Sequence, residues 1–304
     1  MVSGAESAGR PSWAARRRLS AVFWRRGWLR GSLLLVPPLA FFALIYLAAL
    51  VVLLISAFWS VDPLTTEVVR TWSLDNFKTV FTEPIYRTIA LRTIGIAAAV
   101  TITDALVALP FAYFMARLAS PRMRATLFVL VLLPLWASYL ARVYAWRLIL
   151  AKEGALNWTL EHLGLPTIGI AYSNWAMWIV FSYIWLPFMI LPVYAAIERI
   201  PDSFLEASTD LGAKGWRTTR SVVLPLALPG IVAGSIFTFA LTLGDYITPT
   251  LVGGASSQFI GNVVYANVGI ANNVPFAAAY AVIPLLVMGA YLLIAKRLGA
   301  FEAL

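Results

Sequence analysis

Six long apolar segments dominate the sequence and constrain its fold more than any other feature. A helix that crosses the hydrocarbon core of a bilayer needs about 20 mainly apolar residues. Segments that meet this requirement cover residues 33–57, 91–115, 125–146, 175–197, 222–243 and 276–295. The third is the weakest because it contains Arg142 near its outer end, from where a long side chain can reach the membrane surface. The segments predict an all-α, polytopic membrane protein with six transmembrane helices.

The composition supports this prediction. Apolar residues make up 61% of the 304 residues and charged residues 12%, against about 45–50% and about 25% in soluble proteins. The apolar segments leave almost no sequence for a soluble domain. We therefore expect one membrane domain over residues 31–304, preceded by a tail over residues 1–30.

The tail is strongly basic. Its arginines are Arg10, Arg16, Arg17, Arg18, Arg25, Arg26 and Arg30. A basic flank of this kind holds the N-terminus in the cytoplasm and attracts anionic lipid headgroups. The alternative is a cleaved signal peptide, but the uncharged run from Gly31 to Ser60 is too long for one. We therefore expect a basic cytoplasmic tail.

The remaining charges predict the orientation of the other segments. Basic residues collect near residues 117–124, 199–220 and 296–297, which six crossings place in the cytoplasm, and are fewer in the expected outer regions. We therefore expect both termini in the cytoplasm, and we expect the chain in a bacterial inner membrane. The net charge of +9 lies beside membrane segments and not on a soluble domain, so nucleic acid is not an expected partner.

The residues needed for most catalytic chemistry are missing. The sequence has no cysteine, which rules out thiolate metal sites. Its one histidine, His162, lies in a loop between apolar segments, so we expect neither a histidine metal cluster nor a histidine-based triad within this chain. It also has no Gly-Lys pair, so the phosphate-binding Walker A pattern is absent. We expect no enzyme activity, metal site or cofactor in this chain. Any ATP and Mg²⁺ would bind to another subunit.

One charged stretch between the fourth and fifth apolar segments carries a recognisable pattern. It reads Glu206-Ala-Ser-Thr-Asp-Leu-Gly212 and is followed, nine residues later, by Val222-Val-Leu-Pro225. A glycine at this place allows a short helix to end in a left-handed turn. The spacing resembles the EAA loop of ABC importer permeases, which reads EAA, three residues, G, nine residues, I, one residue, LP. Ser208 replaces the second alanine of that pattern and Val222 replaces its isoleucine.

This resemblance implies a role for residues 198–225. In the family the loop forms two short cytoplasmic coupling helices that dock into a cleft on the ATPase subunit. The matching positions here are Glu206, Ala207, Ser208, Gly212, Leu224 and Pro225. The competing interpretation is an ordinary amphipathic loop.

Three further phrases, over residues 138–146, 186–194 and 244–254, resemble the spermidine/putrescine (polyamine-type) permeases. The resemblance covers about residues 33–296 and implies the architecture of a type I ABC importer permease. It also implies a second permease subunit, a dimer of ATPase subunits and an extracytoplasmic solute-binding protein as partners. Relatives with similar phrases carry polyamines, opines, amino-acid-like compounds or ferric ions, so the solute is predicted only as a polyamine or a related small compound.

Two acidic residues are candidates for the solute pathway. Asp104 lies near the middle of the second apolar segment, where an ionised side chain costs at least about 2.5–3.5 kcal/mol. It either contacts a cationic solute, pairs with a base of a partner subunit, or forms an interhelical hydrogen bond with a threonine such as Thr101 or Thr103. Asp245 lies at the outer end of the fifth segment, where it either attracts a cationic amine, with Tyr246 adding a cation–π contact, or caps a helix.

Two other classes of protein remain as alternatives. A secondary transporter would show repeated halves with matching broken helices, and no such repeat is visible. An intramembrane enzyme would need a nucleophile with a base, or paired acids, within the bilayer, and no such spaced pair is visible.

Overall fold

The computed structural model describes residues 27–254 and 256–297, in two units that divide after Ile55. Most of the predicted basic tail lies outside the described residues.

The first unit is an apolar helical run. It consists of α2 (Gly27–Phe41), the π-helical turn η1 (Phe42–Leu47) and α3 (Ala48–Ser56). Residues Leu34–Ser56 are long and apolar enough to cross a membrane, as predicted for the first segment. Most of its large apolar side chains, such as Leu34 and Leu44, are exposed, which suits a helix surrounded by lipid or by another subunit.

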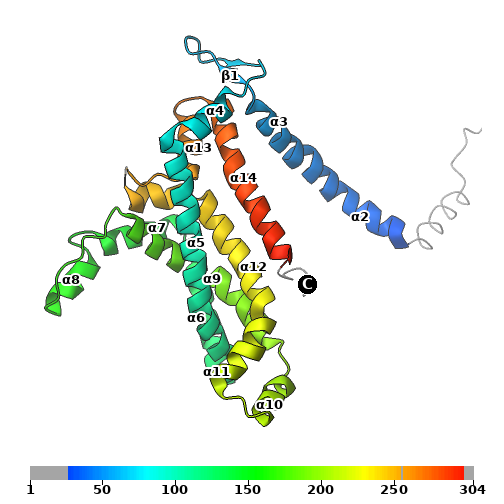
Figure 1. The fold of residues 1–304 in the computed structure, drawn as a ribbon, viewed down its shortest axis with the longest axis vertical. Helices are drawn as coiled ribbons and strands as arrows, with labels where there is room; N and C mark the ends of the chain where they lie inside the picture. The colour runs from blue at the N-terminus through cyan, green and yellow to red at the C-terminus, as the bar shows by residue number, and fades with distance from the viewer. Residues whose placement is uncertain (1–26, 255, 298–304) are drawn as a thin grey trace, which may run out of the picture. The chain divides into compact units, whose positions relative to one another are not determined.

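The second unit is almost entirely helical. Its elements are β1 (Ser60–Val61), β2 (Val68–Val69), α4 (Asp75–Thr82), α5 (Pro84–Tyr113), η2 (Phe114–Leu118), α6 (Pro121–Trp136), α7 (Tyr139–Leu150), α8 (Ala155–His162), α9 (Asn174–Glu198), α10 (Asp202–Asp210), α11 (Gly215–Thr218), η3 (Thr219–Val223), α12 (Leu224–Gly244), η4 (Pro249–Gly253), α13 (Ile260–Gly269) and α14 (Val274–Arg297). The two short strands form an antiparallel hairpin in which Ser60 lies opposite Val69. Figure 1 shows α10 and α11 at the end of this unit opposite to the strands and α4.

Four of the predicted segments in this unit form single long helical spans: Pro84–Leu118, Asn174–Glu198, Gly215–Gly244 and Val274–Arg297. The third predicted segment differs. The chain breaks between α6 and α7, and the helical stretch Tyr139–His162 lies at 94° to α6. The segment over residues 125–146 is therefore not one continuous helix, and the predicted six crossings require the bent pair to count as one span.

Helix α6 contains a proline near its end. Pro134 has no amide hydrogen to donate, and its ring displaces the carbonyl four residues earlier. The helix ends two residues later at Trp136, and Ala137 adopts extended backbone. The 16 residues of α6 span about 24 Å, less than the roughly 30 Å of a hydrocarbon core.

The helices α5, α9 and α12 pack against one another at the centre of the second unit (Figure 1). The contact between α9 and α12 is especially close at two glycines of α12. A Cβ atom on Gly234 would lie 2.7 Å from Met189 Sδ, and one on Gly230 would lie 2.5 Å from the carbonyl oxygen of Pro192. Small residues four apart allow such close backbone approach between membrane helices. Because α9 and α12 flank residues 199–223, this contact positions the segment that carries the predicted coupling loop.

Alanine at either glycine should loosen this contact. We expect Gly234→Ala and Gly230→Ala to destabilise the purified protein by about 1–3 kcal/mol, because a methyl group would overlap fixed backbone or buried side-chain atoms. Thermal unfolding in detergent measures the effect. Gly95→Ala in α5 is the matched control, since a Cβ there meets nothing within 4 Å. Equal unfolding temperatures for all three variants would contradict the proposed close packing.

Candidate functional site

The predicted coupling loop forms a compact helical hairpin. Helix α10 follows α9 after three residues and ends in a turn at Gly212, whose φ angle is +79°. The amide of Gly212 donates to the carbonyl of Thr209 (2.8 Å), and that of Ala213 donates to the carbonyl of Ser208 (3.0 Å). These two bonds are the Schellman motif, which requires a left-handed residue at the first position after the helix. A Cβ on Gly212 would meet nothing within 4 Å, so glycine is needed here for its backbone angle and not for space.

A hydrogen bond between side chains closes the hairpin. Ser208 Oγ on α10 and Thr218 Oγ1 on α11 are 3.0 Å apart, and Thr218 is buried. Ser208 is the residue that departs from the alanine of the family pattern, and the departure adds a polar link between the two arms. Sequence reasoning did not predict this bond because Thr218 lies outside the motif.

The other motif positions lie on two different parts of the structure. Glu206 and Ala207 are exposed on α10, whereas Leu224 and Pro225 form the first turn of α12. The structure thus brings residues 206–212 together on the hairpin, and places the Leu-Pro pair where the long helix begins. Proline suits that first turn, because its missing amide hydrogen would have no helical partner there.

Large apolar side chains protrude from the hairpin. Phe204 is 51% exposed, Leu211 89% and Trp216 76%. Exposed apolar groups gathered on a short polar element are typical of a surface that binds another protein.

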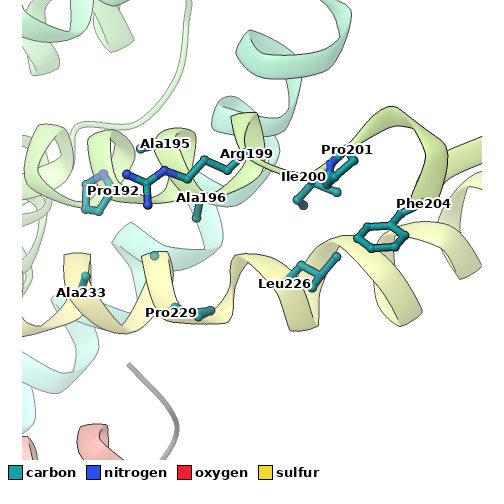
Figure 2. A pocket seen from close by; sticks show the side chains of 11 residues that line it. Pro192, Ala195, Ala196, Arg199, Ile200, Pro201, Phe204, Leu226, Pro229 and Ala233 are labelled. Atoms are coloured by element: carbon teal, nitrogen blue, oxygen red, sulfur yellow. The ribbon is translucent and has the colours of Figure 1, made fainter. Parts of the chain in front are cut away.

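A groove of about 340 Å³ lies beside the hairpin (Figure 2). Its lining is mainly apolar and comes from the end of α9, the start of α10 and the first half of α12; it includes Pro192, Phe204, Leu226, Pro229 and Ala233. Figure 2 shows Arg199 near Pro192 and Ala196, and Phe204 near Leu226. Arg199 is the single charged residue of the lining, and its side chain forms no hydrogen bond or ion pair within the part of the chain that the structure describes. The sequence alone did not predict this groove.

The carboxylate of Asp245 links the non-helical residues that follow α12 to helix α7. Its Oδ1 accepts from the amide of Ile247 (2.7 Å), and its Oδ2 accepts from Thr248 Oγ1 (2.9 Å) and from the hydroxyl of Tyr139. These are the bonds expected if Asp245 caps a helix. Because Tyr139 begins α7, the carboxylate also ties together two segments that are far apart in the sequence.

Asp245 and Tyr246 also line an open recess of about 320 Å³, together with Tyr139 and Trp185. The ring of Tyr246 stacks on that of Tyr265, with centroids 4.6 Å apart. Trp185 is buried, and its indole nitrogen has no hydrogen-bond partner within the described residues. The recess offers one carboxylate and several aromatic rings, and the role of Asp245 and Tyr246 in a solute pathway stays a prediction.

Asp104 is fully buried in α5 and lines neither the groove nor the recess. Its polar neighbour is Ser182 on α9, yet neither carboxylate oxygen has a hydrogen-bond partner of normal geometry within the described residues. Thr101 donates instead to the carbonyl of Ala97, and Thr103 accepts from the indole of Trp178. The structure therefore does not show a hydrogen bond to either threonine, which was one of the three alternatives for Asp104. A solute contact and a pairing with a base of a partner subunit stay predictions.

Comparison with known proteins decides the family. Residues 108–300 match the family described as binding-protein-dependent transport system inner membrane component. The chain belongs to this family of ABC importer permeases.

Several relatives cover most of the chain. The inner membrane ABC transporter permease protein YdcU of Escherichia coli is 47% identical, over 97% of both chains. The spermidine/putrescine permease PotB of the same organism is 34% identical, over 74% of this chain and 82% of that protein. A subunit of a bacterial ABC transporter that imports the polysaccharide alginate has the same fold, with a TM-score of 0.70 and 19% identity over 92% of this chain and 97% of that one.

These findings confirm the predicted class of protein. The chain is a membrane subunit of an ABC importer with an all-α fold and several membrane-spanning helices, and the permease interpretation is favoured over the secondary transporter.

Two arginines of the permease hold helix ends at the hairpin side, a role that their positive charge alone does not predict. Arg124 on α6 donates to the carbonyls of Met115 (3.0 Å) and Ala116 (2.8 Å) and lies 3.6 Å from Glu198 Oε1. Arg117 in η2 donates to the carbonyl of Ile197 in α9 and to the carboxylate of Asp202 in α10. Arginine suits both places, because its planar group carries five donors in a fixed arrangement.

The bonds of Asp245 predict a stability effect that is independent of transport. We expect Asp245→Ala to lower the free energy of unfolding of the permease by about 1–3 kcal/mol, because the buried hydroxyls and the amide of Ile247 lose their acceptor. Thermal unfolding in detergent measures this, with Glu161→Ala as the control, since Glu161 is exposed and no side-chain partner is seen for it in the described part of the chain. An unchanged unfolding temperature for Asp245→Ala would show that these bonds contribute nothing to the fold.

Proposed function

We propose that this chain is one of two permease subunits of a polyamine-type ABC importer, and that α10 and α11 are its coupling helices. Two ATPase subunits in the cytoplasm would bind ATP and Mg²⁺, and an extracytoplasmic binding protein would deliver the solute. The observation that supports the coupling role most directly is the hairpin itself. A Schellman turn at Gly212 and the Ser208–Thr218 bond hold its two arms in one geometry, with Phe204, Leu211 and Trp216 exposed.

The geometry explains how the hairpin would pass on a movement. Helix α9 enters it after three residues, and α11 leads through η3 into α12 without a break. A push on the hairpin therefore acts on the ends of two long helices that touch at Gly230 and Gly234. Rigid-body movement of such helices around a central pathway is a common form of switching.

The proposed solute class rests on the relatives. Several spermidine/putrescine permeases called PotB are 34–35% identical to this chain over 69–74% of its length. A polyamine is a cation, and removing water from an ammonium group is costly unless acceptors or aromatic faces replace it. Asp245 and Tyr246 in the outer recess, and Asp104 in the second span, are the groups of this chain proposed to contribute. Opines, amino-acid-like compounds and ferric ions are the other solutes to be tested.

Uptake by the whole importer tests the function. In proteoliposomes that contain both permeases and the ATPase subunits, with the binding protein outside, we expect ATP-dependent uptake of labelled putrescine or spermidine. Gly212→Val should abolish it, because a β-branched residue at a positive φ costs more than about 1–2 kcal/mol and disrupts the turn. The control is Gly215→Ala, because Gly215 has a negative φ and free space around it. Normal uptake by Gly212→Val would contradict the coupling role, and uptake of an opine or ferric ion without polyamine uptake would contradict the solute class.

The orientation is tested by labelling single cysteines, for which the chain has no native background. We expect an impermeant thiol reagent to label Glu161→Cys from outside intact cells and to reach Lys214→Cys only after the membrane is opened. Both side chains are exposed in the structure, so burial does not limit either reaction. The reverse pattern would place the hairpin outside, where no ATPase subunit could reach it.

A further inference from the structure

Arg117 connects three helices at one point. It lies in η2, the continuation of α5, and its side chain is only 13% exposed. Its Nη1 donates to Asp202 Oδ1 at 2.6 Å, and its Nη2 donates to the carbonyls of Ile197 (2.7 Å) and Ile200. Ile197 belongs to the last turn of α9, Ile200 to the linker, and Asp202 is the first residue of α10.

The position of these acceptors gives the arginine a mechanical role. The last carbonyls of a helix lack helical partners, and a linker of three residues joins α9 to α10. By binding a carbonyl in the last turn of α9, a carbonyl of the linker and the first side chain of α10, Arg117 limits how far α10 can move relative to α9. Arg117 and Asp202 are 85 positions apart in the sequence. Their bond therefore attaches α10 to the end of α5, although the two helices are not consecutive along the chain.

We propose that Arg117 is a positioning residue that fixes α10 to both α5 and α9, so that a movement of the hairpin is passed to three central helices and not only to the two that the backbone continues. This inference rests on the proposed function, in which α10 contacts an ATPase subunit. Helix α5 packs along both α9 and α12, so a displaced end of α5 would shift the whole central group.

Two parts of the link can be separated by mutation. Asp202 is 80% exposed, so Asp202→Ala removes the bond to α10 and leaves the two bonds to carbonyls that hold the end of α9. Arg117→Gln weakens all three bonds. Arg117→Lys keeps the charge but replaces the planar group with a single ammonium, which cannot reproduce the same set of bonds. The control is Arg122→Gln, because Arg122 is exposed on α6 and shows no side-chain bond in the described residues.

The first measurement is the number of ATP molecules hydrolysed per polyamine taken up by the whole importer in proteoliposomes. We expect this ratio to rise about two- to fivefold for Asp202→Ala, the size of effect typical of one exposed ion pair. It should rise more for Arg117→Gln, take an intermediate value for Arg117→Lys and stay unchanged for Arg122→Gln. Loss of a merely structural contact would lower the yield of assembled importer without raising this ratio.

The second measurement does not depend on the solute. Spin labels at Ala125→Cys on α6 and Asp210→Cys at the end of α10, both exposed, report the distance between the hairpin and the membrane helices in the purified complex. We expect a narrow distance distribution in the otherwise native chain, and a broader one when Asp202→Ala or Arg117→Gln is added. Unchanged distributions together with an unchanged ATP ratio in both variants would overturn the role of Arg117. A native complex that hydrolyses ATP but takes up no polyamine would overturn the proposed solute, and the label distances would still decide the role of Arg117.

Discussion

The close contact between α9 and α12 is the interaction on which the rest of the second unit depends. Lipid tails are as apolar as leucine, so membrane helices gain little from burying apolar surface against each other and associate mainly through close packing. Here Gly230 and Gly234 let α12 approach the backbone of α9 at Pro192 and Met189. Because the same two helices enter and leave the hairpin, this approach sets how far apart its two ends lie.

A second constraint concerns the backbone at each break in a helix. Within a membrane, an unpaired amide or carbonyl has no water to bind, so a broken helix needs other partners. Arg117 and Arg124 supply donors to the carbonyls at the ends of α9 and α5, and the carboxylate of Asp245 accepts from the amide of Ile247 after α12. Arg92 does the same for the carbonyl of Ser256, at 2.7 Å. Arg117, Arg124 and Asp245 lie at helix ends or breaks, whereas Arg92 lies within α5, and all four side chains act as part of the scaffold.

The sequence predicted the class of protein and the turn at Gly212, and it did so from local patterns. Five of six spans follow from uninterrupted apolar length, and the turn at Gly212 follows from a glycine at a fixed place in a motif. The bend between α6 and α7 was missed although Pro134 was visible, because prolines also occur in membrane helices that only kink, and hydropathy does not distinguish the two outcomes. The sequence left two roles open for Asp245, a helix cap and a solute contact. Which groups its carboxylate binds depends on where Tyr139 lies in the fold.

The sequence by itself therefore determined which segments are apolar enough to enter a membrane, where one short helix must turn, and the family to which the chain belongs. These properties depend on residues within about 20 positions of each other. Only the tertiary structure decided that Ser208 bonds to Thr218, that Arg117 reaches Asp202 and that Asp104 has Ser182 as its polar neighbour. Such pairs depend on how the helices pack and on the turn that joins α10 to α11, and a single sequence does not show which distant faces meet.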